Sequence, residues 1–259
     1  MHGVLGFGRI LTIDYFNGVA KHLKATFPRA MVLTTTVDPI GTVEKRAHQA
    51  AQQIADSPDK TTLEANKPIH IIAHSMGGLD ARFLVSKDLE HLQGRIRTVI
   101  CLGTPHLGSP VASLLNVANP FELFSSSRRD SRLVDELSKK SNAVHDLSTA
   151  AAAKFNNDCP DIAKVHYFDV AGIGRDAVFP TSAAFHLSHL FVSGLEGQND
   201  GVVSRTSASR NRGPAAVWRA DHADMVGHDL NGPTPESRPA FDYLSAYDTL
   251  VRDFILKNQ

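Results

Sequence analysis

The sequence predicts one α/β domain in which helices cover both faces of a mostly parallel sheet. Three observations favour this class: apolar runs of strand length alternate with helical segments, these runs are apolar along their whole length, and no linker divides the 259 residues. Strands that alternate with helices form parallel sheets, and strands buried on both faces show continuous apolar runs. We expect residues 1–259 to form a single domain, because α/β domains reach this size.

Four segments have the apolar, often β-branched composition of buried strands. They are Met31–Val37, Ile69–Ala73, Arg97–Leu102 and Val165–Val170. Helices are expected at Thr42–Asp56, which contains no Pro or Gly, and at Gly77–Ser86. From Phe241 to Phe254 apolar residues recur every three or four positions, which predicts a helix with one buried face. Residues 107–155 carry helix-like pieces without a strand signal, and we expect a lid or cap insertion there, either mobile over a site or fixed on the surface.

The composition is that of an ordinary globular protein, with 42% hydrophobic and 21% charged residues, which excludes wholesale disorder and a disulfide scaffold. Lys plus Arg and Asp plus Glu both number 27, so the formal charge is zero and gives no general attraction to nucleic acid or anionic membranes. No apolar run reaches the roughly 20 residues that span a bilayer. The start Met-His-Gly-Val-Leu lacks a signal-peptide pattern. We expect a soluble protein without stable membrane insertion, and only this lack of a signal favours a cytoplasmic location.

The strongest local motif is Ala73-His-Ser-Met-Gly-Gly78, where a predicted strand gives way to a predicted helix. A serine at such a turn is held in a strained conformation that exposes its hydroxyl above the sheet edge. Small residues are needed two positions before and after it, and Ala73 and Gly77 meet that requirement. The N–H of Met76 would point from a helix N-terminus towards an oxyanion formed at Ser75. The sequence therefore predicts Ser75 as a nucleophile.

A nucleophilic serine needs a histidine base, which on this kind of fold follows it after an acid. His222 follows the strand-like segment 215–219 and is the first candidate, with His228 as its rival six residues later. His186 and His189 flank another apolar stretch, which favours a structural role.

The orienting acid has two candidates. Asp200 lies in a tight Asn-Asp-Gly turn before an apolar pair, a pattern that also occurs in plain turns. Asp169 near the end of a predicted strand is the alternative.

The N-terminal segment His2-Gly-Val-Leu-Gly-Phe7 has small residues that would let its backbone pass close to the site and complete an oxyanion hole. Gly6-Phe-Gly8 looks like the start of a dinucleotide fingerprint, but Leu11 stands where the third glycine should be, so we reject a nucleotide site. No Cys/His cluster with metal-ligand spacing is present in the sequence.

Six blocks, in order, resemble the bacterial true lipases, which are triacylglycerol lipases of the α/β-hydrolase superfamily, and the related fungal intracellular lipases. These blocks are His2–Phe7, Tyr15–Gly18, Ala73–Arg82, Leu102–Ser109, Gly197–Ser204 and Asp221–Asp224. The resemblance implies the α/β-hydrolase fold, with Ser75 as nucleophile, Asp200 as acid and His222 as base. It also implies an oxyanion hole built from the backbone N–H groups of Val4 and Met76, and a helical lid within residues 107–155.

The resemblance carries two further expectations. The reaction needs no cofactor, but many members bind structural Ca²⁺ through an aspartate two residues after the base, a position that Asp224 occupies; Asp176 is the nearest second carboxylate. In the family an apolar strand precedes the His-Gly segment, whereas only Met1 does so here. We therefore expect about five to eight apolar residues upstream, and poor stability of the chain without them.

Together these inferences predict a serine carboxylic-ester hydrolase, with a triacylglycerol lipase favoured, that works through an acyl-enzyme. The same triad would serve a carboxylesterase, a thioesterase or an acyltransferase. A non-catalytic hydrolase-like binding protein is disfavoured, because such proteins usually lack a member of the triad. The expected partners are a lipid or small ester and, transiently, a lipid interface, without nucleic acid.

Overall fold

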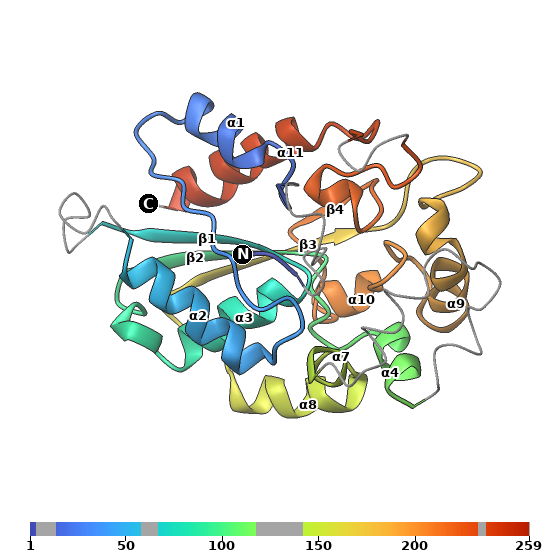
Figure 1. Ribbon diagram of the computed structural model, residues 1–259, viewed down its shortest axis with the longest axis horizontal. Helices are drawn as coiled ribbons and strands as arrows, with labels where there is room; N and C mark the ends of the chain where they lie inside the picture. Colours follow the sequence, from blue (N-terminus) through green and yellow to red (C-terminus); the bar gives the residue numbers. More distant parts are fainter. Residues whose placement is uncertain (4–13, 58–66, 118–141, 233–236, 259) are drawn as a thin grey trace.

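A parallel sheet lies at the centre of the computed structural model, which describes residues 1–3, 14–57, 67–117, 142–232 and 237–258 (Figure 1). The described residues form a four-stranded sheet in the order β1-β2-β3-β4. Its strands are β1 (Ile69–His74), β2 (Ile96–Leu102), β3 (His166–Gly172) and β4 (Ala216–Trp218). All neighbouring strands are parallel, and Ala73 aligns with Cys101, which in turn aligns with Asp169. Three of the four predicted strands are therefore confirmed.

The prediction of a strand at Met31–Val37 is wrong, because this segment forms no strand and pairs with none of the strands among the described residues. Three backbone groups at its C-terminal end bond to side chains instead. The amide of Gln53, on the following helix, both accepts from Thr36 N at 2.9 Å and donates to Thr36 O at 2.7 Å. Val37 N donates to His2 Nε2 at 3.0 Å. An apolar, β-branched sequence thus crosses the surface as an extended segment fixed by polar side chains.

Two helices cover one face of the sheet, α2 (Val43–Ala55) and α3 (Met76–Ser86), as predicted. Thr42 caps α2 by accepting a hydrogen bond from Lys45 N. Small residues let α2 and α3 pack closely against each other and let α3 approach β1 and β2. The cluster on this face includes Ala47, Ala50, Ala51, Ala81, Leu84, Ile71, Val99 and Cys101.

The opposite face is covered by α1 (Val19–Thr26) and α11 (Tyr243–Leu250), which lie together on the other side of the strands in Figure 1. The apolar stripe predicted near the C-terminus packs here, with Tyr247 and Leu250 against Leu102 and Trp218. A π-helical turn, Val251–Ile255, and a 3₁₀ turn, Leu256–Asn258, continue α11. Helices therefore cover both faces, as the sequence predicts.

The described parts of the 107–155 insertion are helical. They contain α4 (Pro110–Val117), α7 (Asn142–Asp146) and the start of α8 (Thr149–Asp158), while residues 118–141 lie outside the described parts. Buried side chains of this layer pack against α3 through Met76 and Leu79. The remaining helices of the described residues are α9 (His186–Glu196), α10 (Arg205–Ala208) and the 3₁₀ turns Leu89–His91, Ala183–Phe185 and Asp224–Val226. Within the described residues, no helix combines the length and apolar character needed to cross a membrane.

Candidate active site

Ser75 occupies the turn between β1 and α3, at the carboxyl end of the sheet. Its φ of 56° and ψ of −132° are unusual for a residue with a side chain. Such a conformation costs on the order of 1–3 kcal/mol and persists only where the surroundings enforce it. Here Ser75 N donates to Leu102 O at 2.8 Å, which ties the turn to the end of β2. The predicted strained turn is present.

Small residues after Ser75 are required by close neighbours. A Cβ at Gly77 would lie 2.7 Å from the carbonyl oxygen of Met1, and one at Gly78 would lie 2.1 Å from Thr104 Oγ1. Neither distance is compatible with a side chain. The requirement predicted for Gly77 therefore holds, and it extends to Gly78, for which the sequence reasoning gave no reason.

The first residues of the chain run alongside β1 and reach Ser75. Met1 N donates to Ile72 O at 2.8 Å, and His74 N donates to Met1 O at 3.1 Å. A Cβ on Gly3 would lie 2.6 Å from Ser75 Cβ, so the backbone passes directly over the serine, as predicted. Val4, the predicted oxyanion residue, lies outside the described residues.

A buried ion pair holds the N-terminal segment that passes over Ser75. Arg46 on α2 and Asp80 on α3 are both fully buried, and Arg46 Nε donates to Asp80 Oδ2 at 2.9 Å. The same guanidinium donates to His2 O at 2.5 Å and to Asp38 O at 2.7 Å. A single cation thus links two helices to the backbone that approaches Ser75.

Asp200 and His222 form the second part of the site. His222 Nδ1 lies 2.7 Å from Asp200 Oδ2, and His222 N donates to Asp200 O at 2.9 Å. The other carboxylate oxygen accepts from Val202 N and Val203 N at 2.9 and 2.8 Å, so the buried carboxylate is held on both sides. Because a carboxylate only accepts, the proton of neutral His222 lies on Nδ1 and Nε2 keeps its lone pair.

His222 lies beside the serine turn. Its ring centroid is 4.5 Å from that of His74, the residue before Ser75. The ring of Phe185 packs edge-on against His222 at 6.3 Å. Burial, reinforced by the neighbouring His222, holds the pKa of His74 well below its usual value, so His74 stays neutral. The structure therefore brings Ser75, Asp200 and His222 to one end of the sheet.

Gly103 is a residue of this site that sequence reasoning missed. It follows β2 with a φ of 52°, and a Cβ there would lie 2.9 Å from Asp200 Oδ2 and 3.3 Å from His222 Nδ1. The backbone that directly follows β2 thus packs against the contact between Asp200 and His222. The signal was present in the Leu102–Ser109 block, where a glycine directly follows a strand.

The alternative residues lie elsewhere. The ring of the buried His228 has its Nε2 3.0 Å from Tyr15 O and 3.2 Å from Asp14 O. Asp169 on β3 accepts two hydrogen bonds from Arg210, at 2.8 and 2.9 Å. Neither residue takes the place of His222 or Asp200.

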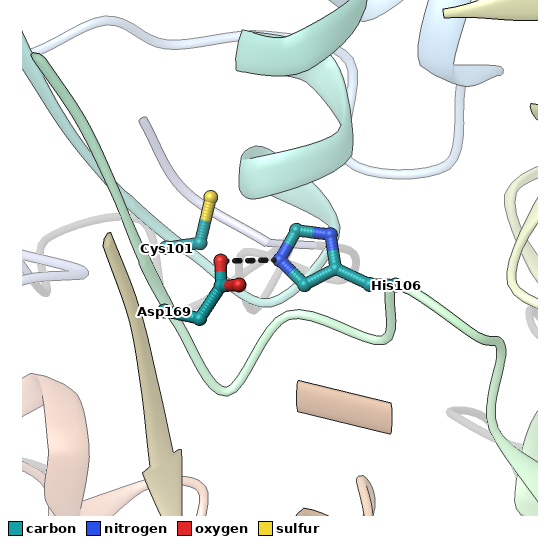
Figure 2. A group of neighbouring side chains, drawn as sticks. All are labelled: Cys101, His106 and Asp169. Carbon is teal, nitrogen blue, oxygen red and sulfur yellow. Dashed lines mark ion pairs between the residues drawn. The ribbon is translucent and has the colours of Figure 1, made fainter. Parts of the chain in front are cut away.

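One cluster in the described chain has the residue types of a metal site. Donor atoms of Cys101, His106 and Asp169 lie within 4.8 Å of one another, and His106 faces Asp169 (Figure 2). His106 Nε2 is 3.0 Å from Asp169 Oδ1, while Arg82 donates to His106 Nδ1 at 3.2 Å. Burial lowers the pKa of His106 to about 4 and raises that of the Cys101 thiol to about 12.

Charge balance argues against a cation in this cluster. Burial opposes ionisation of Asp169, but contacts with His106 and Arg210 hold the pKa of its carboxyl well below the usual range. The guanidinium groups of Arg82 and Arg210 therefore already face a cluster whose one carboxylate is Asp169, and Cys101 is a thiol instead of a thiolate ligand. The cluster is a buried polar network that ties β2 to β3.

The two carboxylates considered for calcium each contact an arginine. Asp176 is largely exposed and lies 3.4 Å from Arg219. Asp224 is buried, and each of its two carboxylate oxygens accepts a hydrogen bond from Arg175. Among the described residues, Asp176 and Asp224 do not belong to a common group of possible metal ligands.

The fold and the serine turn define the class: this is an α/β-hydrolase fold carrying the strand-to-helix serine turn of its serine hydrolases. Residues 41–185 match the family of the PGAP1-like alpha/beta domain, and the chain belongs to that family.

Curated relatives and solved structures agree with this class. The chain is 30% identical over 221 residues to triacylglycerol lipase 2 of Saccharomyces cerevisiae, covering 85% of this chain but only 64% of the yeast protein. It is 23% identical to the triacylglycerol lipase of Pseudomonas fragi, covering 94% and 92% of the two chains.

Among solved structures, a metagenomic carboxyl esterase superposes with a TM-score of 0.73 at 17% identity, covering 97% of this chain and 73% of its own. The Staphylococcus hyicus lipase superposes with a TM-score of 0.68 at 16% identity, covering 97% and 93%. At such identities the likeness concerns the fold.

Proposed function

We propose that this protein is a serine carboxylic-ester hydrolase that acts on lipid esters, as a triacylglycerol lipase does. The observation that carries the proposal is the 2.7 Å contact between His222 Nδ1 and Asp200 Oδ2 beside the Ser75 turn. The names of the yeast and Pseudomonas relatives support lipid esters as the substrate class.

In the proposed mechanism His222 Nε2 takes the proton of Ser75 Oγ as this oxygen attacks the ester carbonyl. Asp200 holds the imidazole in the required tautomer and stabilises the imidazolium that forms. His222 then protonates the leaving alcohol, which departs as the acyl-enzyme forms. Water, deprotonated by His222, attacks the acyl-enzyme and releases the fatty acid.

The negative charge on the tetrahedral intermediate needs nearby donors. Met76 begins α3 directly after Ser75, so its N–H is one of the free amides of the helix N-terminus. We assign this N–H to the oxyanion hole, with that of Val4, implied by the sequence resemblance, as its second donor; Val4 follows Gly3, whose backbone passes over Ser75.

Transient contact with a lipid interface belongs to the same proposal. Helix α4 carries half-buried Val111 and Leu114, and α9 exposes Leu187, Leu190 and Leu195 to the extent of 56–62%. If residues 107–155 act as a lid, specific activity on a long-chain ester should rise once the ester exceeds its solubility limit. Equal specific activity below and above that limit would indicate a fixed cap and an esterase.

The decisive experiment compares the wild type with Ser75→Ala. We expect the wild type to hydrolyse emulsified tributyrin and olive oil and to be labelled by a fluorophosphonate probe, and Ser75→Ala to do neither while keeping its circular dichroism spectrum. A series of p-nitrophenyl esters and thioesters of increasing chain length separates lipase from esterase, and both from thioesterase. Turnover only with an added acyl acceptor would indicate an acyltransferase, and absence of labelling would refute a serine enzyme.

A further inference from the structure

Three carboxylates meet at one guanidinium next to the His222 loop. Arg175 Nε donates to Asp224 Oδ2 at 2.8 Å, and Nη2 donates to Asp224 Oδ1 at 2.6 Å. The same Nη2 lies 3.0 Å from Asp229 Oδ1 and 3.4 Å from Asp221 Oδ2. Asp221 and Asp224 are fully buried, whereas Arg175 is 22% exposed. A positive charge is needed here, because two buried carboxylates side by side repel each other.

The two buried carboxylates determine the shape of the loop that carries His222. Asp221 Oδ1 accepts from Ala223 N at 3.0 Å and from Asp224 N at 2.9 Å, and Asp224 Oδ2 accepts from Asp221 N at 2.9 Å. These bonds close a turn around the backbone of His222 from both sides. The position of the imidazole therefore depends on both carboxylates staying in place.

Arg175 also joins this turn to a preceding loop. Its Nη2 donates to Ser182 Oγ at 3.0 Å, and Ser182 itself donates from both N and Oγ to Asp221 Oδ2, each at 2.7 Å. Ser182 precedes the 3₁₀ turn that ends at Phe185, whose ring packs against His222. One arginine thus fixes both loops that surround the imidazole.

A calcium ion does not fit these residues as they stand. Ca²⁺ takes six to eight oxygen ligands at about 2.3–2.6 Å. Both oxygens of Asp224 already accept hydrogen bonds from the fork of Arg175, whose charge would also repel the ion. The calcium that the sequence resemblance suggests at Asp224 therefore has no room in this chain.

We propose that Arg175 is a positioning residue that holds the His222 loop in the way a divalent cation would, and that this makes the protein independent of calcium. Its effect on turnover rests on the proposed function, whereas its effect on stability and calcium response does not. The proposal predicts that removal of the guanidinium leaves three acidic groups, Asp221, Asp224 and Asp229, around a space that can accept a cation.

The test uses the purified 259-residue protein as wild type, Arg175→Ala, Arg175→Lys and the double variant Arg175→Ala/Asp224→Asn. Arg219→Ala is the matched control, because Arg219 is exposed and contacts only the exposed Asp176 within the described ion pairs. Melting temperatures are measured with CaCl₂, with EDTA and with MgCl₂. We expect calcium to raise the melting temperature of Arg175→Ala alone, and to leave wild type, Arg219→Ala and the double variant unchanged.

Kinetics and labelling distinguish positioning from mere support of the fold. For Arg175→Ala we expect kcat and the rate of fluorophosphonate labelling to fall about tenfold or more with little change in KM, and Arg175→Lys to recover part of the loss. A calcium-dependent melting temperature in the wild type would overturn the proposal. So would an Arg175→Ala protein that melts lower but keeps wild-type kcat. If the wild type hydrolyses no ester, the proposed function fails, while the calcium response of the variants still tests the cation replacement.

Discussion

The hydroxyl of Tyr15 lies 2.8 Å from Nδ1 of His74, the last residue of β1 and the one directly before Ser75. The side chain of His74 is buried and that of Tyr15 is partly buried, and burial raises the pKa of the Tyr15 phenol, so that it stays protonated beside a neutral imidazole. The ring of His74 in turn packs against His222. The uncharged pair of Tyr15 and His74 thus lies next to His222, the proposed base. A positive charge on His74 would disfavour the imidazolium of His222.

Loss of the Tyr15 hydroxyl should therefore weaken the site. We expect Tyr15→Phe to lower the free energy of unfolding by about 1–3 kcal/mol, because His74 Nδ1 would remain buried without a partner. Ester hydrolysis should fall at the same time, through displacement of His222. The matched control is Tyr167→Phe, which removes a hydroxyl that accepts a hydrogen bond from Ile162 N. Urea unfolding and kcat measure both effects, and an unchanged kcat in Tyr15→Phe would separate this pair from catalysis.

Substitution of the proposed triad gives the largest expected losses. Ser75→Ala and His222→Ala should each lower kcat by a factor on the order of 10⁴–10⁶ without unfolding the protein, since each removes a group that makes or breaks bonds. Asp200→Asn should be severely impaired because the histidine loses its orientation. The control is His228→Ala, which we expect to cost far less. An essential His228 and a dispensable His222, measured by steady-state kinetics, would reverse the assignment of the base.

Substitution of Gly103 tests whether the backbone after β2 holds Asp200 and His222 in contact. Gly103→Ala places a methyl group 2.9 Å from Asp200 Oδ2, so we expect kcat to fall by about 100-fold as the pair is displaced. Gly197→Ala is the matched control: its φ is also positive, at 79°, but a Cβ there meets no atom within 4 Å. Both variants should lose stability from backbone strain. Equal kcat values for the two variants would show that Gly103 matters only for its conformation.

Acid should weaken the fold through His106. Its pKa of about 4 in the folded protein lies below its ordinary value of 6.5. Between these values the unfolded chain binds a proton that the folded protein does not, so the free energy of unfolding falls as the pH drops from 6.5 towards 4. Each unit of separation corresponds to about 1.4 kcal/mol.

The measurement is urea unfolding above and within this pH window. His106→Gln should show a shallower dependence on pH than the wild type, whereas His91→Gln, whose side chain is 97% exposed, should match the wild type. Identical slopes for the wild type and His106→Gln would show that other groups cause the acid sensitivity.

The parts of the site that sequence predicts are those determined locally. Ser75 lies in a strand-to-helix turn whose small neighbours are close in sequence, and Asp200 lies in a turn that its own carboxylate stabilises through Val202 N and Val203 N. The strand expected at Met31–Val37 fails because backbone groups at its C-terminal end bond to the side chains of Gln53 and His2 instead of a neighbouring strand. A glycine directly after a predicted strand marks Gly103 as a special position, but that it faces Asp200 and His222 follows only from the packing of distant segments.

The double attachment of His222 to Asp200, through backbone and side chain, makes acid and histidine move as one body. The amide of His222 is therefore expected to exchange its hydrogen slowly with solvent, on the timescale of global opening. An incoming ester then meets a base whose orientation was fixed when the protein folded. Little conformational entropy remains to be lost at this point of the site when the substrate binds.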